Sequence, residues 1–185
     1  MACAPKQNPK DRRIVDNMII GGIILTCTVL PVGFYFMPVS DVRLETAWQR
    51  VIFTFRWQTL SLLTSLFGIH RLMHLRHTTA AINPMSGNDN ILEIDARYLQ
   101  NTFEQLFISA SGQLILATYL ENSVQRVIPV LVLYFVLSRA IFYYGYIKSP
   151  LKRAIGMCMT YAPNLVTYPF SLYCLIVYGP LYGLK

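Results

Sequence analysis

The chain has 185 residues, of which 54% are hydrophobic, 13% are aromatic and 14% are charged, and its formal net charge is +7. Soluble domains average roughly 25% charged residues, so this composition indicates a membrane protein. The Lys and Arg residues form no cluster interleaved with stacking aromatic residues, which argues against nucleic acid as a partner.

The first apolar segment, residues 17–37, contains 21 residues without a charged side chain. This length is enough to cross about 30 Å of hydrocarbon. Arg12 and Arg13 precede it as in a signal peptide, but its apolar core is too long and no small-x-small cleavage site follows. We therefore expect an uncleaved membrane anchor. Cys3, just before it, is a candidate for acylation near the membrane.

Four further apolar segments follow, and each is long enough for a membrane-spanning helix. They cover residues 51–69, 98–120, 127–147 and 154–178. The only long polar connection is residues 77–90, HTTAAINPMSGNDN, and the short later linkers make the last three helices antiparallel neighbours. We predict an all-α integral membrane protein with five spans. Residues 1–44 form a cytosolic N-terminus and an additional helix, and residues 45–185 form a four-helix bundle.

The distribution of Lys and Arg between the two ends of the spans predicts the orientation. Ten lie on the side of the N-terminus: Lys6, Lys10, Arg12, Arg13, Arg71, Arg76, Arg97, Lys148, Lys152 and Arg153. Four lie on the other side: Arg43, Arg50, Arg126 and Lys185. Basic residues accumulate on the cytosolic side of membranes, so we expect a cytosolic N-terminus and a C-terminus in the lumen or outside the cell.

Polar side chains also enter the apolar segments. Arg97, Asn101 and Glu104 are spaced i, i+4, i+7, which places them on one face of a helix. Glu104 lies about 13 Å deep and Arg139, on the next helix, about 12 Å deep at 1.5 Å per residue. We therefore predict a Glu104–Arg139 ion pair, which either serves structure alone or also lines a polar pocket. A stranded carboxylate can take up a proton, so such a pair makes Glu104→Gln more damaging than Arg139→Leu.

The pocket interpretation gains support from the residues that follow Arg139. Tyr143 and Tyr146 share its helix face, and Lys152 and Arg153 stand at the rim. Guanidinium forks, an amide and phenols suit a small anion with several carboxylates.

The pattern R-x-x-x-N-x-x-E at residues 97–104, followed by R-x-x-F-x-x-G-Y at residues 139–146 and by Arg153, resembles the MAPEG superfamily. The resemblance covers roughly residues 47–180, and the additional N-terminal span resembles a divergent member of that family. It implies a four-helix bundle, a homotrimer and glutathione held between subunits.

The resemblance also implies roles for individual residues. Those that match glutathione-binding positions are Arg97, Asn101, Glu104, Arg139, Tyr146 and Arg153. An arginine near the end of the first bundle helix, Arg71 or Arg76, matches the thiolate-stabilising position, and Arg139 is a further catalytic candidate. However, Phe142 stands where many active members have Tyr or His.

Two functions are consistent with this resemblance. The first is a non-catalytic or weakly catalytic membrane factor of the secretory pathway, in the endoplasmic reticulum or in Golgi or secretory-vesicle membranes, with a glutathione-binding pocket at its cytosolic end. The alternative is a membrane-bound glutathione transferase or peroxidase that acts on lipophilic electrophiles. Phe142 and the additional span favour the first slightly.

Other polar features have simpler explanations. His70, His74 and His77 are spaced like metal ligands, but a solvated helix end at the headgroups explains them better, so we expect no metal. Arg56 either reaches the membrane surface or pairs with Gln113. Pro163 predicts a kink in the last helix.

Overall fold

The computed structural model describes residues 8–38, 43–83, 85 and 87–183. Its regular elements, in chain order, are α1 (Pro9–Phe36), α2 (Ala47–Thr78), η1 (Ala80–Ile82), η2 (Asp89–Leu92), α3 (Glu93–Tyr119), η3 (Asn122–Val124), α4 (Val127–Lys148) and α5 (Ala154–Tyr178). There is no strand among these residues, which confirms the predicted all-α fold. Cys3, Lys6 and Lys185 lie outside the described residues.

Three helices begin before the apolar segments that predicted them, namely α1, α2 and α3, whereas α4 and α5 match their segments to within one residue. At the start of α1 the Asn8 side chain accepts a hydrogen bond from the Lys10 N–H, and α2 begins with a capping box between Thr46 and Gln49. α2 continues to Thr78, about two turns past its apolar segment. Hydropathy indicates the length of an apolar run, whereas hydrogen bonding and caps decide where a helix ends.

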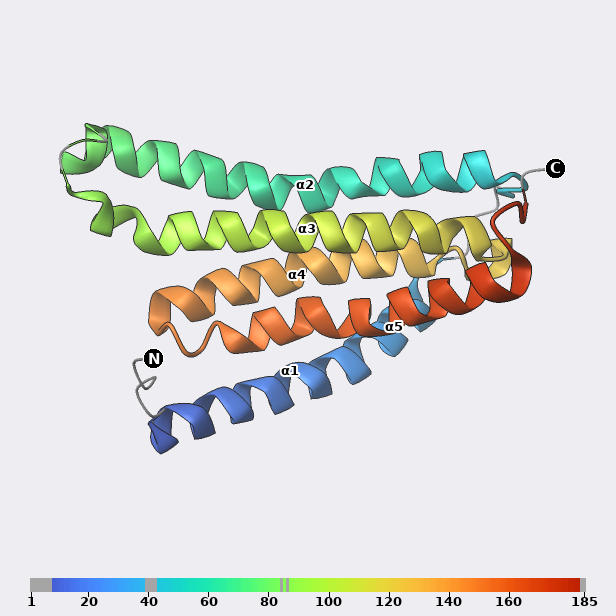
Figure 1. Ribbon diagram of the computed structural model, residues 1–185, viewed down its shortest axis with the longest axis horizontal. Coiled ribbons are helices and arrows are strands. Elements are labelled where there is room, and N and C mark those ends of the chain that lie inside the picture. The colour runs from blue at the N-terminus through green and yellow to red at the C-terminus, as the bar shows by residue number, and fades with distance from the viewer. Residues whose placement is uncertain (1–7, 39–42, 84, 86, 184–185) are drawn as a thin grey trace, which may run out of the picture.

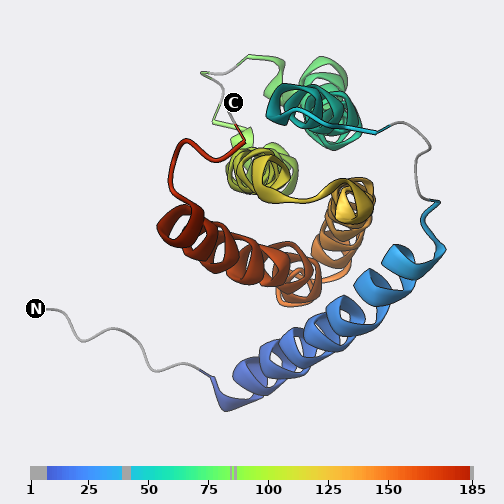
Figure 2. The same ribbon diagram turned by 90° about the vertical axis from the view of Figure 1, so that its right-hand side faces the viewer.

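The helices α2 to α5 alternate in direction and form the bundle (Figure 1). α2 packs against α3 and α4, and α5 packs against α3 and α4. The additional helix α1 crosses the outer face of α4 and α5 obliquely (Figure 2). We call the end where α2 and α4 finish and α3 and α5 begin the basic end, because it carries most of the Lys and Arg residues.

The interior of the bundle is polar. Gln58 Nε2 donates to Gln113 Oε1 at 2.7 Å, and Asn164 Nδ2 donates to Ser109 Oγ at 3.0 Å. In contrast, large apolar side chains face outward, including Phe107 (74% exposed) and Ile176 (75% exposed). This arrangement is typical of membrane helices, which pack through small and polar residues while apolar residues face lipid.

Two segments are apolar and long enough to cross a membrane by composition alone, Pro9–Phe36 and Asn122–Lys148. The polar side chains of α2 and α3, several of which lie in the interior, lower the mean hydropathy of these two helices below that of α4.

Two predictions about individual residues can be compared with the fold. Arg56 is exposed and does not contact Gln113. The Gln113 side chain instead accepts a hydrogen bond from Gln58, which lies on the buried side of α2. α5 remains one continuous helix through Pro163 and Pro169.

Candidate functional site

Arg139 on α4 is the most buried cation of the described chain, with no exposed surface. Its Nη1 donates to Asn101 Oδ1 at 2.8 Å, and its Nη2 donates to Thr160 Oγ1 and to the Gly156 carbonyl oxygen at 3.3 Å. The guanidinium also lies over the Phe142 ring, 4.6 Å from its centroid. Oxygen acceptors from α3 and α5 and an aromatic face therefore compensate this charge inside the bundle.

Close packing of α4 and α5 makes these contacts available. A Cβ atom on Gly156 would collide with the backbone of Phe142, so only glycine allows this approach. The Thr160 hydroxyl also donates to the Gly156 carbonyl oxygen, at 2.8 Å, which fixes its position beside Arg139.

The predicted Glu104–Arg139 ion pair is wrong for the single chain. Glu104 is exposed and accepts a hydrogen bond from Gln100 Nε2 at 3.2 Å, on its own helix. The rotation of α3 about its axis explains the error. Tyr98 and Thr102, each one position from the predicted stripe, face the bundle interior, so Asn101 lies at the edge of the interface and Glu104 outside it.

Arg97 also lies outside the interior. It is exposed, and its Nη2 pairs with Glu93 Oε1 at 2.8 Å, one turn earlier on α3. Of the three-residue stripe, therefore, only Asn101 contacts Arg139.

A cavity of about 300 Å³ opens at the basic end beside this cluster. Asn101, Phe142 and Arg153 line it, together with residues of α1, of the α4–α5 connection and of α5: Val15, Pro150, Leu151, Ala154 and Met157. The Arg153 guanidinium lies over the ring of Tyr146, 4.9 Å from its centroid. Two of the six predicted binding residues, Asn101 and Arg153, therefore line one cavity, and the Tyr146 ring packs against the Arg153 guanidinium.

The two arginines proposed for the thiolate position have different partners. Arg71 Nε donates to Tyr143 Oη at 3.1 Å and lies 3.5 Å from Asp95 Oδ1. The Tyr143 hydroxyl donates to the same Asp95 oxygen at 2.8 Å. The hydrogen bond with Tyr143 and the nearby carboxylate raise the pKa of the Arg71 guanidinium, which keeps it charged. Arg76 instead pairs with Asp89 at 3.8 Å, in the polar connection.

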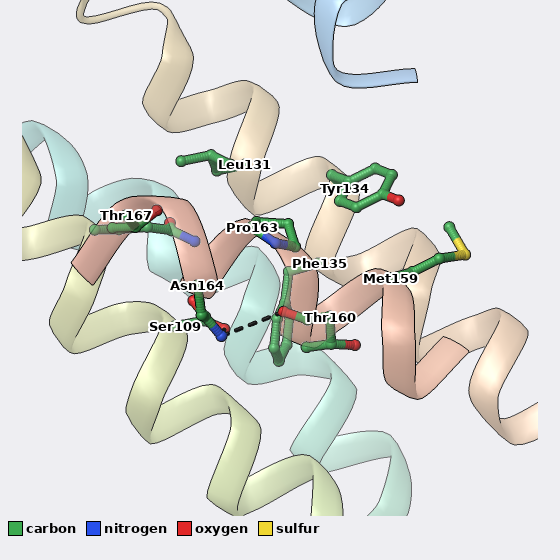
Figure 3. A pocket seen from close by; sticks show the side chains of 10 residues that line it. Ser109, Leu131, Tyr134, Phe135, Met159, Thr160, Pro163, Asn164 and Thr167 are labelled. Atoms are coloured by element: carbon green, nitrogen blue, oxygen red, sulfur yellow. Dashed lines mark hydrogen bonds between the residues drawn. The ribbon is translucent and has the colours of Figure 1, made fainter. Parts of the chain in front are cut away.

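A smaller polar space lies deeper in the bundle. Asn164 and Ser109 lie side by side there, between Pro163 and Thr160 (Figure 3). Its free volume is only about 10 Å³, too small for an organic ligand. This region therefore serves helix packing.

The three histidines of α2, His70, His74 and His77, are exposed. No group of three or more His, Cys, Asp or Glu side chains in the described ranges is arranged to hold a metal ion.

The sequence interpretation missed Thr160 and Asp95, which anchor Arg139 and Tyr143. A signal was present for Thr160, because α5 carries polar residues at helical spacing and they mark its buried face: Thr160, Asn164, Thr167 and Ser171.

The model of the MAPEG family matches residues 57–173, from within α2 to within α5. Transmembrane protein 79 of Mus musculus is 23% identical over 168 residues, which is 91% of this chain and 43% of that protein. The Bos taurus protein of the same name is 24% identical over 162 residues, 87% of this chain and 41% of that protein.

The chain therefore spans less than half the length of these curated relatives. Transmembrane protein 79, also called mattrin, is itself a member of the matched family, which confirms the divergent relationship expected from the sequence. No solved structure matches the chain.

Proposed function

Because this chain belongs to the MAPEG family, we propose that it is a glutathione-binding membrane factor of the secretory pathway with little or no catalytic activity. It crosses the membrane of the endoplasmic reticulum, the Golgi or a secretory vesicle five times, with its N-terminus and its basic end in the cytosol. Glutathione occupies the cavity lined by Asn101 and Arg153, whose amide and guanidinium suit the ligand's carboxylates.

The observation that supports binding without catalysis is that Arg139 already donates hydrogen bonds to acceptors inside the bundle. Activation of a glutathione thiol needs a cation or a hydrogen-bond donor beside the sulfur. Arg139 has no exposed surface, and three acceptors of the bundle take hydrogens of its Nη1 and Nη2, although its buried Nε has no hydrogen-bond partner. Phe142, which also lines the cavity, has no hydroxyl group to donate.

The outward position of Glu104 supports a homotrimer. Charged groups that face hydrocarbon are costly, at least about 2.5 kcal/mol each on insertion scales. Contact with a neighbouring copy would remove the Glu104 side chain from lipid. Mass measurement in nanodiscs is expected to give three copies, and a stable monomer would contradict this assembly.

The second candidate is a glutathione transferase or peroxidase for lipophilic electrophiles. Tyr143 favours it, because its hydroxyl contacts Arg71 while its side chain lines an apolar groove of about 450 Å³ between α2 and α4. A lipophilic substrate in that groove would lie beside a tyrosine held by a cation.

Thermal unfolding of the purified protein with reduced glutathione tests the proposal. Binding is expected to stabilise the protein by about 2.7 kcal/mol at one hundred times the dissociation constant. Arg153→Ala should abolish the shift. Lys148→Ala should preserve it, because Lys148 is exposed at the same end and contacts Tyr144 instead.

A turnover assay with a generic electrophile, such as chlorodinitrobenzene, separates the two candidates. Binding without turnover supports the non-catalytic factor, whereas turnover that falls in Tyr143→Phe supports the enzyme. If millimolar glutathione produces no thermal shift, the binding proposal is wrong and the cluster around Arg139 serves helix packing alone.

A further inference from the structure

An apolar groove of about 490 Å³ lies between the additional helix α1 and the bundle. A Cβ atom on Gly22 would lie 2.9 Å from Cys158 Cβ, and one on Gly33 would lie 3.1 Å from Val130 Cγ1, so α1 touches α5 at one point and α4 at another. α1 runs obliquely past α4 and α5 (Figure 2), and residues of these three helices and of α3 line a groove between them. The lining is almost entirely apolar and includes Leu30, Phe34, Leu131, Pro163, Val166 and Phe170.

One cation lies at the mouth of this groove. The Arg126 guanidinium lies 4.1 Å from the centroid of the Phe34 ring, and the residues Val124 and Val127 beside it in sequence also line the groove. Arg126 Nε is buried without a hydrogen-bond partner. None of the ion pairs formed by residues in the described ranges involves Arg126.

The position of Arg126 along the bundle matches a membrane surface. It directly precedes α4, whose 22 residues extend to Lys148 at the basic end. At 1.5 Å per residue this helix spans about 33 Å, close to the hydrocarbon thickness of a bilayer. Arg126 therefore lies at headgroup level on the side opposite the glutathione cavity, while the groove extends from it toward the membrane centre.

We propose that the groove binds one anionic glycerophospholipid of the bilayer, with an acyl chain between α1 and α5 and its phosphate on Arg126. The volume lies within the 300–1,000 Å³ typical of small-molecule sites. A guanidinium binds phosphate oxygens through paired hydrogen bonds, and the phosphate supplies the negative charge that the protein does not place there. The range matched by the family, residues 57–173, excludes α1, so this site belongs to the additional helix.

Native mass spectrometry of the full chain, with phosphatidylglycerol and phosphatidylcholine of identical acyl chains, tests the site. We expect phosphatidylglycerol to bind at least about tenfold more tightly, because the choline cation of phosphatidylcholine offsets the negative charge that its phosphate brings to Arg126, whereas phosphatidylglycerol keeps a net negative charge. Arg126→Gln should remove this preference, and Arg126→Lys should retain part of it. Equal retention of both lipids by the wild-type protein would overturn the proposal.

A matched pair of tryptophan substitutions tests the groove itself. Ala162→Trp fills the space under α1 and should reduce binding of both lipids, whereas Ala140→Trp, in the separate groove between α2 and α4, should not. Unchanged phosphatidylglycerol binding by Ala162→Trp would contradict the assignment.

A photoreactive acyl chain on phosphatidylglycerol tests the wild-type protein without any substitution. Crosslinks are expected on peptides of α1 and α5. Crosslinks confined to α2, or a second copy of the chain shown by chain-to-chain crosslinking to occupy the groove, would overturn the proposal.

Discussion

Arg139 illustrates how a single buried charge is accommodated in this protein. Among the residues that the structure describes, no carboxylate pairs with it. Its stabilisation comes from an amide, a hydroxyl and a backbone carbonyl, and from the face of Phe142. Removal of the guanidinium leaves Asn101 Oδ1 without this donor, whereas the Gly156 carbonyl oxygen keeps its hydrogen bond from the Thr160 hydroxyl.

Substitution of Arg139 therefore affects the fold more than substitution of Glu104. Arg139→Leu should destabilise the chain by about 1–3 kcal/mol, because it leaves buried acceptors unsatisfied. Glu104→Gln should change the stability of the single chain by less than about 0.5 kcal/mol, since the side chain is exposed. Unfolding of both variants in detergent, followed by circular dichroism, measures the difference. Equal losses would show that Glu104 has a buried partner. This ordering reverses the expectation from the sequence.

At the scale of elements, the approach of α4 and α5 depends on glycines. Gly156 brings α5 against the backbone of Phe142, and a Cβ on Gly145 would lie 2.7 Å from the Lys152 carbonyl oxygen. These contacts hold Arg139 near its acceptors and fix the α4–α5 connection that forms one wall of the cavity at the basic end.

Gly156→Ala should separate α4 from α5. The new methyl group meets backbone atoms, which cannot move aside as a side chain can, so a cost of about 1–3 kcal/mol is expected. Gly21→Ala is the control, because its Cβ would meet only Ile155 Cδ1 at 3.7 Å. That change should be neutral or slightly stabilising, since alanine favours helix. Melting temperatures of the two variants test this, and a similar loss in both would contradict the role assigned to Gly156.

At the scale of the whole molecule, the protein has a polar interior, an apolar surface and two ends with different roles. The basic end contains the cavity lined by Asn101 and Arg153, for which we propose glutathione, and the opposite end contains Arg126 and the groove under α1. The proposals of glutathione at the basic end and of an anionic phospholipid at Arg126 both depend on the orientation of the chain, because the orientation decides which end faces the cytosol and which faces the lumen.

Glycosylation mapping tests this orientation. An Asn-X-Ser/Thr acceptor appended after residue 185 should be modified, because an odd number of spans places the C-terminus in the lumen. An acceptor inserted in the polar connection between α2 and α3 should remain unmodified, because the excess of Lys and Arg retains that end in the cytosol. The reverse pattern would invert the topology.

The sequence by itself determined the helices and the family. An apolar segment in lipid must satisfy its backbone hydrogen bonds internally, so hydropathy along the chain is enough to predict a helix. The paired motifs around Asn101 and Arg139 were enough to predict the family match, because their spacing is a property of the sequence alone. Equal depth on neighbouring helices predicted a contact between Glu104 and Arg139, whereas the contact in the structure is between Asn101 and Arg139.

Only the tertiary structure decided which side chains meet. Glu104 and Asn101 lie on one stripe, yet at 3.6 residues per turn they differ by about 60° around the helix axis. The packing of α2, α4 and α5 sets the rotation of α3, and that rotation directs Asn101 toward Arg139 and Glu104 outward. The tertiary structure also decided the contact of Thr160 with Arg139, which joins α5 to α4, and the contact of Arg126 with Phe34, which joins the start of α4 to α1. Both contacts depend on how the helices cross and not on the spacing of residues in the sequence.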